Sequence, residues 1–154
     1  LHARHPERPL EVTATDDADI HVDPRLFRRV IDNLVENAHK YTPDTRSPIE
    51  LAVARDGDHV VFEVRDRGVG ISSEDLPRIF TAFFRSERSR SRETGGVGLG
   101  LTLAKRIVEA HGGTIEATST IHVGTTIRVA IPVAEPTTSA GATATTAGRA
   151  TSAR

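Results

Sequence analysis

The chain has 154 residues, and its 20 Lys and Arg residues nearly balance its 21 Asp and Glu residues, which leaves a net charge of −1. This length suits one domain with a real core, and the charge balance gives no general electrostatic reason to bind nucleic acid or an anionic membrane. The absence of cysteine excludes disulfides, thiolate catalysis and cysteine metal sites. No stretch approaches the roughly 20 apolar residues of a membrane span.

The two ends of the chain differ in composition from the middle. Residues 1–8 lack the apolar core of a secretion signal and are interpreted as the end of a linker from an upstream part of a longer chain. Residues 134–154 are rich in Thr and Ala and predict a disordered, low-complexity tail. A single domain is therefore expected over residues 9–133. The absence of cysteine fits a reducing compartment, and the domain is expected in the cytoplasm, with any membrane anchor of a parent protein lying upstream.

The predicted elements follow one another as strands at 9–14 and 17–22, a helix at 23–43, a hairpin at 47–66, a short helix at 72–84, a mobile charged loop at 85–94, a helix at 98–113 and a closing hairpin at 113–133. Asp23 can cap the first helix and Pro43 ends it, and Ser72 or Ser73 can cap the short one. Most strands are joined by hairpins. This order predicts an α+β fold: a two-layer sandwich in which a mixed, mainly antiparallel sheet packs against about three helices.

The first long helix carries a polar arc beside its apolar face. At about 100° per residue, Asn33, Glu36, Asn37 and Lys40 fall next to one another. Asparagine is a mediocre helix former, so two asparagines on one edge need a reason. One interpretation is a solvated flank. The other is a polar edge facing a cleft, where amide oxygens ligate a hard cation and the lysine meets an anion. The helix alone leaves both open.

Asp66 ends the second strand of the first hairpin. By the two-residue period it shares a face with Val60, Phe62 and Val64, so its carboxylate continues a buried apolar face and needs donors. The glycines of the following "RGVG" allow a ligand to approach the backbone. The segment is either a turn at a strand end or an acceptor for an exocyclic amine, such as that of adenine.

The stretch "GGVGLGL" at residues 95–101 fits neither of two familiar phosphate loops. It has no lysine where a Walker loop requires one. A dinucleotide fingerprint would place glycine at Leu101, and it would follow a hydrophobic strand, whereas this stretch follows polar and charged residues.

Five ordered motifs give the stretch its context: "NLVENAHKYT" (33–42), "DRGVGI" (66–71), "IFTAFFR" (79–85), "GGVGLGL" (95–101) and "HGGTIEATSTIHVGTTIRVAIP" (111–132). Together they resemble the ATP-binding catalytic domain of bacterial sensor histidine kinases, which belongs to the Bergerat-fold superfamily. The resemblance covers roughly residues 9–133 and makes "GGVGLGL" similar to the family's second glycine box. In that box, backbone amides and a helix N-terminus hold the ATP phosphates.

The resemblance implies a site for ATP and Mg²⁺. Asn37 matches the ligand of the Mg²⁺ that bridges the phosphates, Asp66 matches the adenine-specific carboxylate, and Thr125 matches the hydroxyl that supports the adenine pocket. The full set of implied nucleotide-binding residues is Asn33, Asn37, Lys40, Tyr41, Asp66, Gly68, Gly70, Ile71, Phe80, Gly96, Val97, Gly98, Leu99, Gly100, Leu101 and Thr125. Two departures are mild: Phe84 stands where tyrosine is common, and Val97 where a small hydroxyl residue is common.

Three residues are the implied catalytic groups. Lys40 and Arg85, the latter from the phenylalanine box with Phe80 and Phe83, would neutralise the phosphates. Glu36 is either a base for the incoming nucleophile or a side chain on the helix rim. ATP hydrolases of the superfamily carry glutamate where this chain has Asn33, which favours transfer to a protein over transfer to water.

The implied phosphoryl acceptor is not in this chain. In the family it is a histidine in a separate dimerisation domain, within a pattern like H-E-x-R-T-P, and none of the seven histidines here has that context. The expected partners are that domain of the same kinase and a response regulator, with no nucleic acid or membrane contact, and the isolated chain is expected to be a monomer. An anti-sigma-factor-type serine kinase and a non-catalytic nucleotide-sensing module of the same fold remain alternatives.

Overall fold

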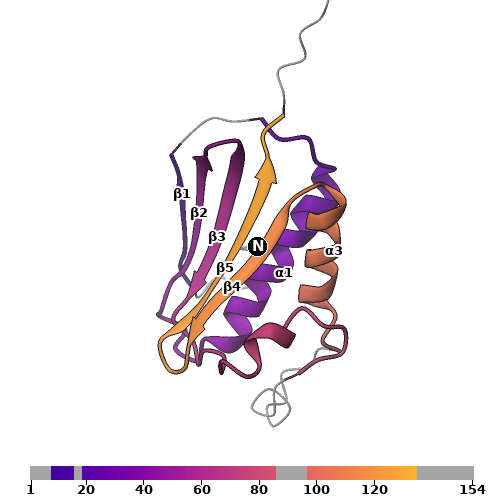
Figure 1. The fold of residues 1–154 in the computed structure, drawn as a ribbon. Coiled ribbons are helices and arrows are strands. Elements are labelled where there is room, and N and C mark those ends of the chain that lie inside the picture. The colour runs from indigo at the N-terminus through magenta and orange to yellow at the C-terminus, as the bar shows by residue number, and fades with distance from the viewer. Residues whose placement is uncertain (1–7, 16–18, 86–96, 135–154) are drawn as a thin grey trace, which may run out of the picture.

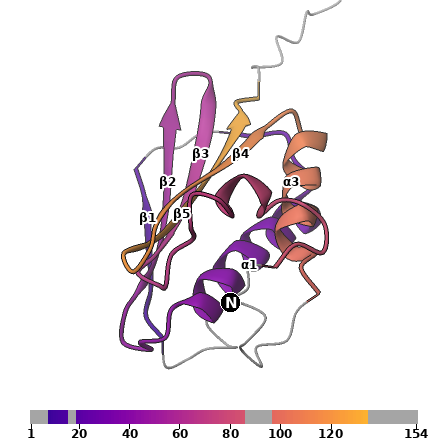
Figure 2. The same cartoon turned by 60° about the horizontal axis from the view of Figure 1, so that its bottom comes forward.

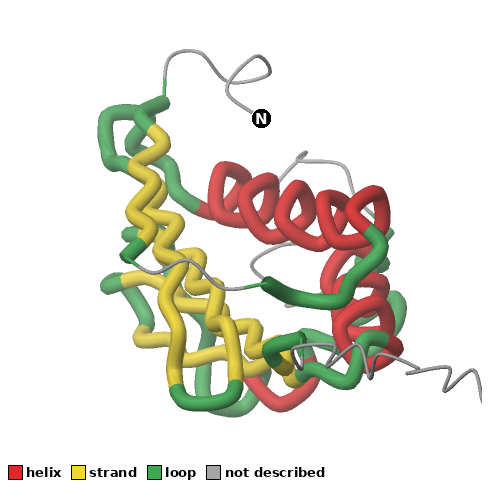
Figure 3. Tube along the Cα trace, turned by 90° about the horizontal axis from the view of Figure 1, so that it is seen from above, coloured by secondary structure: helices red, strands yellow, loops and turns green. Residues whose placement is uncertain are grey.

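The computed structural model describes residues 8–15, 19–85 and 97–134, which form two layers (Figure 1). The elements in chain order are β1 (Leu10–Ala14), α1 (Pro24–Tyr41), β2 (Ile49–Asp56), β3 (His59–Asp66), the 3₁₀ helix η1 (Leu76–Arg78), α3 (Gly100–Ala110), β4 (Thr114–Thr120) and β5 (Gly124–Pro132). Seen from above, the two α-helices make one layer and the strands make the other (Figure 3). The predicted two-layer α+β architecture is confirmed.

The sheet is mixed and mainly antiparallel, as the sequence predicts. Its strand order is β1-β2-β3-β5-β4. Only β1 and β2 pair in parallel, while the other three neighbouring pairs are antiparallel. Because β3 lies at the centre, its last residue, Asp66, is placed opposite Thr125 at the start of β5. Two segments that are far apart in the sequence therefore meet at one end of the sheet.

The core lies between the helices and one face of the sheet. Val30 and Leu34 of α1 and Val108 of α3 are fully buried, so the apolar stripes of both helices turn toward the strands. Phe27 of α1 meets Phe62 of β3 edge to face, with ring centroids 4.9 Å apart. Burying each such side chain contributes about 1.5–3 kcal/mol. This packing fixes α1 and α3 against β3, whose end carries Asp66.

Local signals account for the ends of α1. The carboxylate of Asp23 accepts hydrogen bonds from the backbone N–H groups of Arg25 at 2.8 Å and Leu26 at 3.2 Å, and Pro24 occupies the first turn. The helix ends at Tyr41, two residues before Pro43, which agrees with the disfavoured helical conformation before proline. The helix expected over 23–43 is thus confirmed, and with it the spacing of its polar arc.

Two predicted elements are shorter than expected. Instead of a strand at 17–22, Ile20 makes one isolated bridge to Val133, and residues 16–18 lie outside the described part. Instead of a helix over 72–84, the chain forms only the three-residue η1. Ser72 Oγ does accept the N–H of Asp75 at 3.2 Å, as a cap would. However, Phe83 has a φ of 62°, which a helix cannot contain.

Two further predictions fall outside the described residues. They are the mobile loop, of which residues 86–94 are not described, and the low-complexity tail, of which only Ala134 is described. Within the described part, no helix is long and apolar enough to cross a membrane.

Candidate functional site

Asp66 is a buried carboxylate with donors on one oxygen. The residue is 9% exposed, and Oδ1 accepts the backbone N–H groups of Gly68 at 2.8 Å and Thr125 at 3.2 Å. Burial raises the pKa of Asp66, and these two hydrogen bonds and the positive charge of Arg8 oppose that rise. Among the described residues Oδ2 receives no hydrogen bond, so it can accept one from a ligand donor.

The glycines after Asp66 hold the loop close to its neighbours. A side chain at Gly68 would overlap the carbonyl oxygen of Tyr41, which accepts the N–H of Val69 at 3.0 Å. Gly70 has a φ of 67°, and a side chain there would overlap the backbone of Thr120. The loop is therefore fastened between the end of α1 and the turn that joins β4 to β5.

Ser119 in β4 is a residue of this region that the sequence reasoning missed. Its Oγ accepts the N–H of Ile71 at 2.8 Å, donates to the carbonyl of Gly124 at 2.8 Å, and lies 2.9 Å from Thr125 Oγ1. Ser119 pairs with Thr125 across the two strands. Two hydroxyl residues paired beside the turn of a hairpin are a signal that could have indicated it. Ser119 ties the loop after Asp66 to Thr125.

Asn33 and Asn37 of α1 lie against the first turn of α3. A Cβ added to Gly100 would stand 3.4 Å from Asn33 Oδ1 and 3.9 Å from Asn37 Nδ2. Asn33 Nδ2 is buried without a hydrogen-bond partner among the described residues. Leu99, at the N-cap of α3, makes no side-chain capping bond. Two side-chain amides and the positive end of a helix dipole therefore face the same small region.

The segment of the phenylalanine box packs near the start of α3 (Figure 2). The carbonyl of Gly98 accepts the N–H of Phe83 at 3.1 Å, which joins the two motifs directly. The ring of Phe80 lies 5.8 Å from Lys105 Nζ of α3. Phe83 and Val97 are both 68% exposed. Arg85, the last described residue of the segment, is half-buried.

The remaining candidate residues surround these two groups. Lys40 Nζ lies 5.2 Å from the centroid of the Tyr41 ring, and Glu36 is exposed on α1. Leu99 is exposed, while Leu101 packs against the core. Gly96 lies outside the described residues. The structure thus brings the candidate residues into two clusters. One surrounds the carboxylate of Asp66, the other surrounds Gly100 and the two asparagines, and α1 runs between the clusters.

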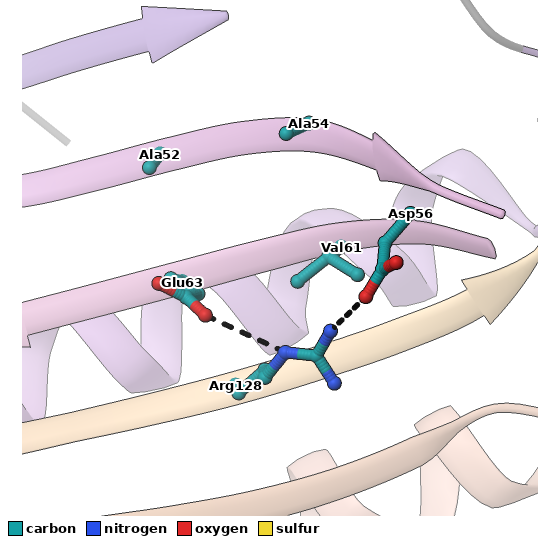
Figure 4. A pocket seen from close by; sticks show the side chains of 6 residues that line it. All are labelled: Ala52, Ala54, Asp56, Val61, Glu63 and Arg128. Atoms are coloured by element: carbon teal, nitrogen blue, oxygen red, sulfur yellow. Dashed lines mark hydrogen bonds and ion pairs between the residues drawn. The ribbon is translucent and has the colours of Figure 1, made fainter.

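A shallow hollow on the opposite face of the sheet is separate from this region. It encloses about 220 Å³ and is lined by Ala52, Ala54, Asp56, Val61, Glu63 and Arg128, with the helices lying behind the strands (Figure 4). Arg128 lies 2.6 Å from Asp56 and 3.4 Å from Glu63, so its guanidinium is already paired. None of the candidate residues lines it, and small side chains explain its shape. The region beside α1 and α3 is the better candidate for a functional site, because it holds the buried carboxylate of Asp66 and the two asparagine amides.

Comparison with known proteins assigns the family. Residues 22–135 match the family described as "Histidine kinase-, DNA gyrase B-, and HSP90-like ATPase". The chain is 37% identical over 120 residues to the sensor histidine kinase WalK of Bacillus subtilis (strain 168), which covers 77% of this chain and 20% of WalK. It is 39% identical over 131 residues to the sensor-like histidine kinase SenX3 of Mycobacterium tuberculosis (strain ATCC 25618 / H37Rv), which covers 77% of this chain and 32% of SenX3. The chain thus spans a third or less of the length of these curated relatives.

Solved structures agree with this assignment. The mycobacterial sensor histidine kinase MprB superposes with a TM-score of 0.77 at 28% identity, covering 86% of this chain and 88% of that one. Full-length ShkA, solved in complex with AMPPNP, superposes with a TM-score of 0.69 at 29% identity, covering 86% of this chain and 27% of that one. The chain therefore belongs to the histidine kinase-, DNA gyrase B- and HSP90-like ATPases, as a catalytic domain of the sensor histidine kinase type.

Proposed function

We propose that this domain binds Mg·ATP beside α1, α3 and the end of β3. It then transfers the γ-phosphoryl group to a histidine on a separate dimerisation domain, from which a response regulator receives it. The observation that carries the proposal is the arrangement of Asp66 at one end of the region and the Asn33–Asn37–Gly100 contact at the other. The first suits an amino-purine, and the second suits phosphates with a cation.

The hydrogen-bonding capacity of Asp66 supports binding of the adenine base at this end of the region, which is called the base end. An ionised carboxylate only accepts, and Oδ2 has no donor among the described groups, whereas the exocyclic amine of adenine offers one. Guanine presents a carbonyl oxygen at the same edge and would leave this acceptor unpaired. Such an unpaired buried acceptor costs about 1–3 kcal/mol, which favours ATP over GTP.

The phosphate end is supported by the start of α3. Its first-turn N–H groups are not capped by the side chain of Leu99, and an anion at a helix N-terminus satisfies such groups. Asn33 Nδ2 is also buried without a partner in the described part of the chain, and a phosphate oxygen would supply one. The absence of a side chain at Gly100 leaves room for the anion beside both asparagines.

The same residues suit Mg²⁺ only together with the nucleotide. The described residues contain no group of three or more His, Cys, Asp or Glu that could hold a metal alone. Asn37 would supply one amide oxygen, while phosphate oxygens and water complete the coordination, as is usual for Mg²⁺. When bound there, Mg²⁺ would neutralise charge on the phosphates.

The transfer step needs positioning and charge neutralisation more than covalent catalysis. The bond between the γ-phosphorus and its bridging oxygen breaks and ADP keeps the electron pair. The imidazole nitrogen with the free lone pair forms the new P–N bond, and the ring loses the proton on its other nitrogen. Glu36, exposed on α1, would accept that proton. Lys40 and Arg85 would neutralise the phosphate oxygens. Asn33 cannot act as the base for water, so hydrolysis should be slow.

The test is phosphoryl transfer from radiolabelled ATP. We expect this chain alone to remain unlabelled, and to label a dimerisation domain supplied in trans weakly, because untethered partners lack the effective concentration of a linker. The product should be labile in acid and stable in base, as a phosphoramidate is. The Asn37→Ala variant should lose the transfer, and Asp32→Asn, at a half-buried position of α1 that pairs with Arg28, should keep it.

Each alternative gives a different result. An acid-stable phosphoserine on the partner would support a serine kinase. Tight Mg·ATP binding without any transfer would support a nucleotide-sensing module. Labelling of this chain itself would contradict the proposal, because the acceptor would then lie within it.

A further inference from the structure

Arg8 is a buried charged residue that lies two residues before β1. Its side chain is 4% exposed, which is rare for arginine unless its donors are satisfied. Its Nη2 donates to the carbonyl of Thr42 at 2.7 Å, and its Nη1 donates to the carbonyls of Asp44 at 2.9 Å and Ser47 at 3.2 Å. All three acceptors belong to the loop that follows α1. The guanidinium therefore holds that loop from within.

The consecutive residues Tyr41 and Thr42 lie between Arg8 and the loop after Asp66. Thr42, which is itself buried, gives its carbonyl to Arg8, and the carbonyl of Tyr41 accepts the N–H of Val69 at 3.0 Å. Gly68 touches the same Tyr41 carbonyl so closely that no side chain would fit. A short, continuous path of contacts thus runs from Arg8 to the residues that hold the Asp66 carboxylate.

Arg8 also acts on Asp66 through its charge. Burial raises the pKa of Asp66, and the positive charge of Arg8 lowers it, which favours the ionised acceptor. Three other described basic residues on neighbouring elements are exposed or contact other groups. Arg65 and Arg67 are exposed, and Arg67 pairs with Glu50 at 3.0 Å. Lys40 lies over the Tyr41 ring on α1.

We propose that Arg8 is a positioning residue for recognition of the nucleotide base: it holds the carbonyl of Thr42 and so fixes the end of α1 behind the loop in which Gly68 donates to Asp66. This inference rests on the proposed function. It goes further because it ties the segment that enters the domain to the base end of the site. Loss of the Arg8 contacts would change affinity for the base without changing affinity for the phosphates.

Two variants separate the charge of Arg8 from its hydrogen bonds. Arg8→Lys keeps the charge but loses the planar fork that reaches three carbonyls, and Arg8→Gln loses the charge. Arg46→Gln is the matched control, because Arg46 lies in the same loop but is exposed and bonds only to Asp44 in the described structure. Affinities for Mg·ATP and for Mg·tripolyphosphate, which lacks the base, are measured by displacement of a fluorescent ATP analogue between pH 4 and pH 8.

We expect Arg8→Gln to bind Mg·ATP about tenfold more weakly, because it loses the charge-assisted hydrogen bonds that hold the loop after α1 and the positive charge near Asp66. Tripolyphosphate affinity should stay at the wild-type level, and the loss of ATP affinity in acid should begin at higher pH than in wild type. Arg8→Lys should keep the wild-type position of this acid limb, so it carries the test if Arg8→Gln does not fold. Arg46→Gln should change nothing.

The outcomes distinguish the inference from the function on which it rests. Wild-type ATP affinity at every pH in Arg8→Gln would overturn the positioning role, as would an equal loss of ATP and tripolyphosphate affinity. The positioning role would also be overturned if Arg8→Lys lost its ATP affinity in acid at a different pH from wild type. If the wild-type protein binds neither probe, the proposed function itself fails.

Discussion

His111 accepts a hydrogen bond from the backbone N–H of Asp23 at 3.0 Å, although 88 residues separate the two in the sequence. The same ring places Nδ1 2.7 Å from the carbonyl of Ile107. A carbonyl only accepts, so the proton must be on Nδ1, which leaves Nε2 free to accept from Asp23. One neutral imidazole thus joins the C-terminal end of α3 to the N-terminal end of α1.

We predict that His111→Ala destabilises the domain by about 1 kcal/mol, the usual net contribution of such a hydrogen bond. His111→Gln, which can still donate and accept, should recover part of the loss. Urea unfolding monitored by circular dichroism measures both. His59→Ala is the control, because His59 is exposed at the β2–β3 turn. Equal effects at the two histidines would show that the link between the helices contributes nothing.

We predict that the buried, ionised carboxylate of Asp66 lowers the free energy of unfolding at neutral pH. Burial raises its pKa above the ordinary aspartate value, so the folded state binds this proton more tightly than the unfolded state does. The contribution of the group to stability is fully present in acid, below the unfolded-state pKa, and is lost as pH rises through the raised folded-state pKa. In the Asp66→Asn variant, the amide oxygen could keep accepting from Gly68 and Thr125.

Asp66→Asn should therefore be more stable than wild type at pH 7, and the difference should vanish toward pH 3. The same variant should lose affinity for ATP, because its amide nitrogen would face the adenine amine, donor against donor. Thermal unfolding over a pH series and a nucleotide titration test the two halves separately. A variant that is less stable than wild type at pH 7 would mean that Asp66 stabilises the native state in its ionised form.

Periodicity was sufficient to predict most of this fold. The apolar stripe of α1 and the alternating apolar residues of β3 predict these two elements correctly, because each element buries one face against the same core. The helix predicted over residues 72–84 is wrong. The segment is rich in apolar residues, but it contains Pro77, and the backbone of Phe83 is in the left-handed conformation. Its shape depends on the Gly98 contact, which is tertiary.

In the candidate site, too, residues that depend on tertiary contacts are hard to predict from the sequence. Asp66 and the asparagines stand out because polar groups interrupt or border an apolar pattern. Ser119 and Arg8 do not, since Ser119 binds the distant main chain of Ile71 and Arg8 binds three distant main-chain carbonyls. A serine in a Thr-rich strand and an arginine among many arginines carry no periodic signal. The role of Arg8 is revealed only by the folded arrangement, and Ser119 has no signal beyond its pairing with Thr125 beside a turn.

Asn37 gives a direct test of the cation site. Asn37→Ala removes the candidate amide ligand from the edge of α1, and alanine is the best helix former, so the fold should persist. We expect Mg²⁺-dependent ATP binding to be lost in isothermal titration calorimetry while the melting temperature stays within a few degrees of wild type. Asp32→Asn, which only loosens a long 3.9 Å pair with Arg28, is the control. Unchanged Mg·ATP affinity in folded Asn37→Ala would remove Asn37 from the metal site.

The last prediction concerns Ser119, which joins the loop after Asp66 to the β4–β5 hairpin. In Ser119→Ala, the N–H of Ile71 and the carbonyl of Gly124 both lose a partner. Leaving a partly buried polar group unpaired costs about 1–3 kcal/mol, so the variant should be measurably less stable.

The effect should also be local. Because Thr125 Oγ1 loses its neighbour at 2.9 Å, ATP affinity should fall, while tripolyphosphate affinity should not. Thr118→Ala, an exposed neighbour on the same strand, is the matched control for stability and binding. Ser119→Thr keeps the hydroxyl and should recover most of the affinity. If Ser119→Ala lowers affinity for both probes alike, or for neither, Ser119 does not hold the base end of the site.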